Sequence, residues 1–251
     1  MDILDFVKNE LGLAAYKDSY LLRRINARMI RRGIKSKEEY LRILKSDEKE
    51  VKALKDALSI NVTSFFRNPE VWEKLKELLK DDKTPLKAWS AACSEGREPY
   101  SLAILCEEIG RDVKIIATDI DDDALWTARK GIYEDMGVTD IGKELMAFIT
   151  DVKKYFDIYG NTYRIKPHLK KKITFIKHDI INDEPPAKNF DLVLCRNFLI
   201  YVEPKFKPVI AENIAKALKK GGILVLGKTE NIPANDYFEV VDRVNRIYVR
   251  I

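Results

Sequence analysis

Glu98 stands where a strand is expected to end and a helix to begin. It lies in residues 91–100 (AACSEGREPY), which follow an apolar stretch and lead into a helical pattern. A turn of small residues with one glycine lets a ligand approach the backbone and the N-terminus of the next helix. A carboxylate there suits a cationic group on that ligand. The helix dipole alone also favours glutamate in a first turn, so both interpretations stand.

Asp119 ends the next expected strand, about twenty residues after that glycine. An acidic residue in this place accepts hydrogen bonds from ribose hydroxyls in nucleotide-type sites. Three more aspartates follow in residues 121–123, and one of them is expected to cap the next helix. The glycine turn lacks the GxGxxG fingerprint, which weighs against a pyrophosphate bound in it.

Two later strand ends add polar residues to the same edge of the expected sheet. A third strand is expected to end at residues 178–180 (HDI) and a fourth at residues 195–197 (CRN). In open α/β sheets, ligands bind outside the carboxyl ends of the strands. The order and spacing of these runs together predict a nucleotide-type ligand site.

The charge of the first fifth of the chain points to an acidic partner. Residues 20–35 contain six basic side chains and no acidic one. Arg24, Arg28 and Arg31 recur at i, i+4 and i+7, which places them on one face of a helix. That face predicts electrostatic capture of an acidic substrate surface, and the alternative is an ordinary solvated basic face.

The elements that must position these residues fall into two regimes. Residues 1–80 show helical spacing of apolar residues, which predicts a small all-helical domain. In residues 81–251 apolar strands alternate with amphipathic helices, which predicts an α/β domain with a largely parallel sheet. Residues 133–172 interrupt this alternation and predict an inserted helix and β-hairpin, either a partner-docking subdomain or a cover. The last fourteen residues predict an antiparallel hairpin at one edge of the sheet.

Composition limits the class of protein. The 251 residues are 46% hydrophobic with a net charge of +5, as expected of a globular protein with a full core. No apolar run approaches the ~20 residues that cross a bilayer, and the N-terminus is too acidic for a signal peptide, so the cytoplasm is expected. Three widely spaced cysteines and two histidines argue against a disulfide framework and against a metal site.

Long stretches of the chain resemble the chemotaxis receptor glutamate methyltransferases. The stretches that carry the resemblance are YLLRRINARMIRRGI, SINVTSFFRNPEVWEKL, WSAACSEGREPYSLA, FDLVLCRNFLIY and LKKGGILVLGKTENI. The resemblance implies a class I, Rossmann-like methyltransferase domain that uses S-adenosylmethionine. It further implies methyl transfer to glutamate side chains in the cytoplasmic helical domain of methyl-accepting receptors. A monomer is expected, with neither nucleic acid nor membrane insertion.

The resemblance also implies roles for individual residues. Its cofactor contacts fall on Asn61, Thr63, Arg67, Glu98, Asp119, Asp179, Ile180, Arg196 and Asn197. Arg67 and Tyr201 match positions near the reacting carboxylate, which gives them catalytic roles. Arg97 departs from the family, whose loop usually carries two glutamates before the proline, and Glu98 keeps the cofactor role. The inserted turn at Gly160 is short for tethering a receptor peptide.

The implied chemistry fits a site that is poor in histidine. A glutamate with a pKa of about 4.3 is already ionised at neutral pH, so methyl transfer to it needs no general base. Two alternatives remain. One is a methyltransferase acting on RNA or a small molecule, in which the basic helix would contact phosphates. The other is a non-catalytic receptor-binding adaptor of the same fold.

Overall fold

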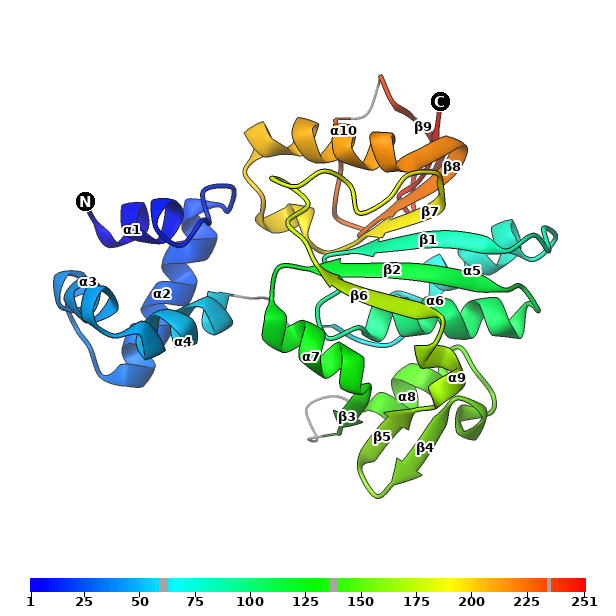
Figure 1. The fold of residues 1–251 in the computed structure, drawn as a ribbon, viewed down its shortest axis with the longest axis horizontal. Helices are drawn as coiled ribbons and strands as arrows, with labels where there is room; N and C mark the ends of the chain where they lie inside the picture. Colours follow the sequence, from blue (N-terminus) through cyan, green and yellow to red (C-terminus); the bar gives the residue numbers. More distant parts are fainter. Residues whose placement is uncertain (59–62, 136–139, 234–235) are drawn as a thin grey trace. The chain divides into compact units, whose positions relative to one another are not determined.

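The computed structural model describes residues 1–58, 63–135, 140–233 and 236–251, which form two compact units (Figure 1). The first unit is Met1–Ile60 with Ile200–Lys207, and the second is Asn61–Leu199 with Pro208–Ile251. We call them the helical unit and the sheet unit. The sequence predicted a domain boundary at residue 80, whereas the boundary between the two units comes earlier in the chain. The reason is that Trp72 and its helix pack in the core of the sheet unit.

Four helices build the first part of the helical unit. They are α1 (Ile3–Asn9), α2 (Asp18–Arg32), α3 (Lys37–Ser46) and α4 (Glu48–Leu58). Each buries one apolar face, and Leu21, Ile25 and Leu54 lie in the shared core. The all-helical character that the sequence predicted for this region is confirmed.

A later segment completes the helical unit. The short helices η2 (Leu199–Tyr201) and η3 (Pro204–Phe206) lie in this part of the chain. Val202 forms a β-bridge with Tyr16, and the backbone N–H of Lys17 donates to the carbonyl of Tyr201 at 2.9 Å. Residues 200–207 therefore belong to this unit by backbone pairing, although they directly follow a strand end of the sheet unit.

A buried carboxylate ties three helices of this unit together. Glu50 of α4 is 3% exposed and accepts two hydrogen bonds of 2.9 Å from the guanidinium of Arg28. The hydroxyl of Tyr40 on α3 donates to the same carboxylate at 2.7 Å. The hydrogen bonds from Arg28 hold the pKa of Glu50 below its ordinary value. Arg28, which the sequence placed on a docking face, is thus engaged inside its own unit.

The sheet unit is built on a seven-stranded sheet in the order β6-β2-β1-β7-β8-β10-β9. Its strands are β1 (Leu86–Ala91), β2 (Val113–Asp119), β6 (Ile173–Lys177), β7 (Phe190–Cys195), β8 (Leu218–Leu226), β9 (Phe238–Asp242) and β10 (Ile247–Arg250). The first five strands of that order pair in parallel, and β10 is antiparallel to β8 and β9. The predicted α/β class with an antiparallel C-terminal hairpin is confirmed.

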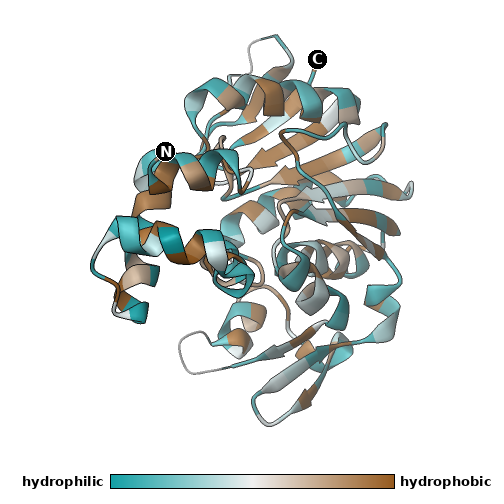
Figure 2. Cartoon of the chain, turned by 60° about the vertical axis from the view of Figure 1, so that its left-hand side comes forward, coloured by the Kyte–Doolittle hydropathy of each residue, from teal (hydrophilic) through white to brown (hydrophobic). Residues whose placement is uncertain are grey.

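Helices cover the central strands of the sheet. They are α5 (Pro69–Leu79), α6 (Arg97–Glu108), α7 (Asp122–Lys130) and α10 (Lys207–Ala217). Right-handed crossovers put α6 and α7 on one face and α10 on the other, since the chain moves outward from the centre in opposite directions in the two halves of the sheet. The central strands are coloured mainly as hydrophobic in Figure 2, as expected for parallel strands covered on both faces.

A smaller sheet interrupts the alternation where the sequence predicted an insertion. Its order is β3-β5-β4, with β3 (Ile132–Glu134), β4 (Phe156–Tyr159) and β5 (Thr162–Ile165). The helices that accompany it are α8 (Ile141–Met146), η1 (Val152–Lys154) and α9 (Pro167–Lys170). The hairpin turns at Gly160, where φ is +59°. The third strand, β3, was not predicted, because three residues carry no readable alternation.

None of the helices in the described ranges is both long enough and apolar enough to span a membrane.

We expect the Arg28→Ala substitution to lower the free energy of unfolding of the helical unit by about 2 to 3 kcal/mol, since it leaves the buried Glu50 carboxylate with weaker partners. Urea denaturation followed by circular dichroism measures the change. Arg31→Ala removes an exposed arginine from the same helix and is the matched control. Equal losses in the two variants would contradict a structural role for Arg28.

Candidate functional site

The order of the strands reverses at the centre of the large sheet. From β1 the chain moves outward to β2 and β6, and from β7 it moves outward to β8 in the other direction. Loops leaving β1 and β7 therefore diverge at their carboxyl ends, which is where open α/β sheets bind ligands. The residues after β1, β7 and β8 and the loop before α5 supply the side chains of the candidate site.

Backbone in the left-handed region concentrates in these loops. The non-glycine residues there with positive φ are Phe66, Asn68, Ala92, Ser94 and Asn197. Such residues persist only where their surroundings fix them, and they cluster at ligand sites. Gly96 also has a positive φ, and a Cβ on it would lie 2.8 Å from that of Ala128, so glycine is required by both conformation and space.

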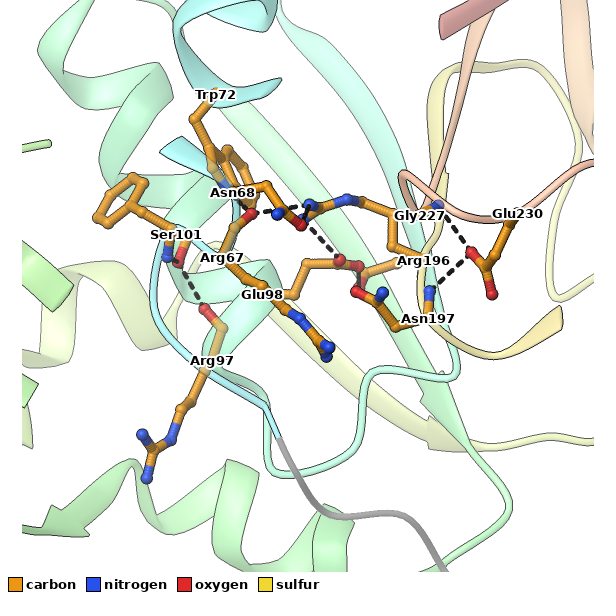
Figure 3. A network of polar contacts seen from close by, with 12 residues as sticks. Arg67, Asn68, Trp72, Arg97, Glu98, Ser101, Arg196, Asn197, Gly227 and Glu230 are labelled. Carbon is orange, nitrogen blue, oxygen red and sulfur yellow. Dashed lines mark hydrogen bonds and ion pairs between the residues drawn. The ribbon is translucent and has the colours of Figure 1, made fainter. Parts of the chain in front are cut away.

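A buried ion pair joins the first turn of α6 to the end of β7. The guanidinium Nη1 of Arg196 lies 3.4 Å from Oε2 of Glu98 (Figure 3). The hydroxyl of Ser90 donates to the other carboxylate oxygen at 2.8 Å. Burial raises the pKa of Glu98, although the charge of Arg196 opposes this. Nε of Arg196 is buried without a hydrogen-bond partner in the described part of the chain.

Arg196 also fixes the loop that precedes α5. Its Nη2 donates to the carbonyl oxygen of Arg67 at 2.7 Å and to the side chain of Asn68 at 3.3 Å. The indole N–H of Trp72 donates to the same carbonyl at 3.1 Å, and the guanidinium of Arg196 lies over that indole ring. Figure 3 shows Arg67, Glu98 and Arg196 in one network, which brings together three residues named from the sequence.

Asp119 ends β2 beside the loop after β1. Its two carboxylate oxygens accept the backbone N–H groups of Ser94 at 2.7 Å and of Asp121 at 3.0 Å. Burial raises its pKa. A carboxylate has about four lone-pair sites, so Asp119 keeps acceptor capacity for a ligand hydroxyl. The helix cap falls to Asp121, whose side chain accepts two N–H groups of α7, which separates the two roles that the sequence left open.

The residues after β6 form a turn of their own. The carboxylate of Asp179 accepts the N–H of Ile181 at 2.8 Å and the side-chain amide of Asn182 at 2.7 Å. Ile180 is buried, and its carbonyl oxygen accepts a hydrogen bond from Asn213 of α10 at 3.0 Å. The turn holds both predicted residues in place through these hydrogen bonds, which do not involve the ion pair of Glu98.

The remaining predicted residues lie in several places. Asn61 falls outside the described residues, and Thr63 is half-buried at the start of the described loop. Tyr201 belongs to the helical unit, where its ring centroid lies 4.9 Å from that of Tyr20. On α2, Arg24 lies over the ring of Tyr20, Arg28 pairs with Glu50, and Arg31 is exposed.

Arg97, the residue that departs from the family pattern, has a structural role that the sequence did not reveal. Its side chain points away from Glu98 in Figure 3. It lies over the rings of Phe65 and Tyr133, and its Nη1 is 3.5 Å from a carboxylate oxygen of Glu144. Because Glu144 also accepts the N–H of Phe65 at 3.0 Å, the pair ties the insertion to the loop before α5.

A second residue missed from the sequence is Glu230, which is 1% exposed. It lies in the run GKTEN that carried part of the resemblance, but no role was assigned to it. Its carboxylate accepts backbone N–H groups from Asn197 and Gly227. The only signal available beforehand was an acidic residue just after a buried strand.

We expect Arg97→Glu to lower stability by about 2 kcal/mol or more, although it restores the residue type usual in the family, since it places a carboxylate against Glu144 in a buried setting. Adding Glu144→Gln should recover part of the loss. Thermal unfolding measures both variants, and the exposed Arg243→Glu is the control for the change in charge. Unchanged unfolding of Arg97→Glu would refute the buried pair.

Comparison with known proteins places both units in one family. A family model for the CheR methyltransferase all-alpha domain matches residues 2–59, and one for the CheR methyltransferase SAM binding domain matches residues 61–247. A chemotaxis protein methyltransferase of Listeria monocytogenes is 36% identical over 235 residues, 90% of this chain and 87% of that protein. One of Borreliella burgdorferi is 30% identical over 259 residues, 95% of this chain and 90% of that protein. The chain therefore belongs to the CheR methyltransferase family and is an S-adenosylmethionine-dependent methyltransferase.

Proposed function

We propose that this methyltransferase esterifies glutamate side chains of chemotaxis receptors. The observation that carries the proposal is the buried pair of Glu98 and Arg196 at the reversal of strand order, in a chain whose relatives are chemotaxis protein methyltransferases. The receptor domain is its cytoplasmic helical part, whose glutamates are the acceptors. The polypeptide acts as an enzyme on this protein substrate.

The side chains at the strand ends fit S-adenosylmethionine. Its α-amino group suits the Glu98 carboxylate, since a bound cation favours the ionised form of an acid whose pKa is raised by burial. Its carboxylate suits Arg67 and the unpartnered Nε of Arg196. Its ribose suits Asp119, and its adenine suits the turn of Asp179 and Ile180. Asn61, Thr63 and Asn197 complete the proposed set.

The bound cofactor supplies a methyl group on a positively charged sulfur, and the protein supplies position. The substrate glutamate is already ionised, so the chain has no proton to remove. Arg67 orients the carboxylate of the substrate glutamate through its planar guanidinium. The backbone carbonyl of Arg67 is held by hydrogen bonds from Arg196 and Trp72. Tyr201 is proposed as a hydrogen-bond donor or as a wall for the substrate. Exclusion of water by these groups strengthens each polar contact.

The proposed docking surface on α2 is narrower than the sequence suggested. Arg28 is occupied by Glu50, and Arg24 lies over Tyr20, whereas Arg31 is exposed. Arg23 is exposed as well, although its guanidinium also lies 5.7 Å from the centroid of the Tyr20 ring. We propose that Arg31, with Arg23, attracts the acidic receptor helix. Arg24 and Arg28 contribute to this surface through their contacts with Tyr20 and Glu50 inside the helical unit.

Transfer of labelled methyl from S-adenosylmethionine to a receptor cytoplasmic fragment should give a product that base releases, as expected of a methyl ester. Arg67→Ala should lower the rate about a hundredfold, since misplacing the reacting groups has that order of cost. Arg67→Lys should recover little, because a point charge does not reproduce the planar fork.

The exposed Arg243→Ala is the matched control and should retain the full rate. Label found in RNA or in a small molecule, or label that resists base, would overturn the proposed substrate.

Arg23→Glu with Arg31→Glu should raise the Michaelis constant for the receptor fragment several-fold, about as expected for loss of exposed steering charges, and leave cofactor affinity unchanged. The defect should shrink as salt rises, because salt screens the attraction of the wild type. Lys45→Glu with Lys49→Glu makes the same charge change on exposed positions of the same unit. If both double variants behave alike, α2 is no specific docking surface.

A further inference from the structure

Strands β7 and β8 deliver two loops side by side at the candidate site. The strands are parallel neighbours, and Cys195 pairs in register with Leu226. The next residues, Arg196 with Asn197 on one strand and Gly227 on the other, therefore leave the sheet next to each other. A residue that bonds to both loops therefore also fixes the conformation of the residues that follow β7.

Glu230 makes that connection. The chain turns after β8, with the N–H of Glu230 donating to the carbonyl of Gly227 at 2.8 Å. The side chain then folds back, and one carboxylate oxygen accepts the N–H of Asn197 at 2.7 Å and that of Gly227 at 2.6 Å (Figure 3). With 1% exposure, this carboxylate replaces water for both N–H groups.

Two independent features show that the arrangement is tightly constrained. Asn197 has a φ of +62°, in the left-handed region that asparagine tolerates better than most residues with a side chain, and its N–H is held there by Glu230. A Cβ on Gly227 would lie 2.5 Å from the carboxylate of Glu230 and 2.9 Å from both nitrogens of Asn197. Glycine at 227 is therefore required by close approach, and the amide of Asn197 packs directly over it.

The same carboxylate lies close enough to act on the ion pair of the site. Burial is the main cause of the raised pKa of Glu98, and the negative charge of Glu230 adds to it. Burial lowers the pKa of Arg196, and the charges of Glu98 and Glu230 oppose this. Arg196 thus lies in the field of two buried carboxylates, one of which holds the backbone of the next residue.

We infer that Glu230 is a positioning residue for cofactor binding, which holds Asn197 in its left-handed conformation so that Asn197 and Arg196 meet the cofactor. This inference rests on the proposed cofactor roles of Asn197 and Arg196. Its charge also acts on Glu98 and Arg196, but the inference concerns its hydrogen-bond acceptance from Asn197 and Gly227, which an uncharged oxygen of the same shape can supply.

The test is the affinity for S-adenosylhomocysteine, measured by titration calorimetry on the full chain. Glu230→Ala should weaken binding at least about tenfold, because it leaves two buried N–H groups without their acceptor. Glu230→Gln keeps an oxygen at the same place and should restore binding to within about threefold of the wild type. Gly227→Ala should weaken binding like Glu230→Ala, and the exposed Glu239→Ala should have no effect.

Each of the following outcomes would overturn the inference. Wild-type affinity in Glu230→Ala, with only a lower melting temperature, would show a purely structural role. An equal defect in Glu230→Gln and Glu230→Ala would show that charge matters and that hydrogen-bond acceptance does not. Wild-type affinity in Asn197→Ala would remove the proposed cofactor role of Asn197, on which the inference rests. Weakened binding in Asn197→Ala together with wild-type binding in Glu230→Ala would overturn the inference and leave that cofactor role intact. If Glu230→Ala does not fold, Glu230→Gln and Gly227→Ala carry the same comparison.

Discussion

The site depends on one buried ion pair, between Glu98 at the start of α6 and Arg196 at the end of β7. Burying two charges costs more than their attraction returns unless other groups satisfy them. Here Ser90 satisfies part of the carboxylate, and the backbone of Arg67 with the side chain of Asn68 satisfies part of the guanidinium. A pair of this kind adds little net stability, so its value lies in fixing three loops in one place.

The loop after β7 connects that pair to the rest of the protein in two ways. On one side, Glu230 holds the backbone of Asn197 against Gly227. On the other, the chain passes within a few residues into the segment Ile200–Lys207, which pairs with the helical unit. Asn197, which is proposed to contact the cofactor, and Tyr201, which is proposed to contact the substrate, are therefore close neighbours in the sequence.

Charged residues in this chain cannot be assigned to function by charge alone. The sequence placed Arg28 on a basic helix face and Arg97 in a ligand loop, where it departs from the family pattern. Each proves to be paired with a glutamate, Glu50 or Glu144, in a poorly hydrated setting. Loss of such an arginine would reduce activity through misfolding, and a binding assay without a stability control would misattribute the effect.

The sequence by itself predicted the α/β class, the all-helical N-terminal region and the family, though not the short strand β3, because hydrophobic periodicity and the turn around Gly96 are local properties. It also placed Glu98 in the loop between a strand and a helix, and Asp119 and Arg196 at strand ends, and their roles toward the cofactor stay predictions. Only the tertiary structure decided which partner each charge takes. The roles of Arg28, Arg97 and Glu230 depend on groups distant in the sequence, 22, 47 and 33 residues away, and the contribution of a buried charge is set by the groups that replace its lost water.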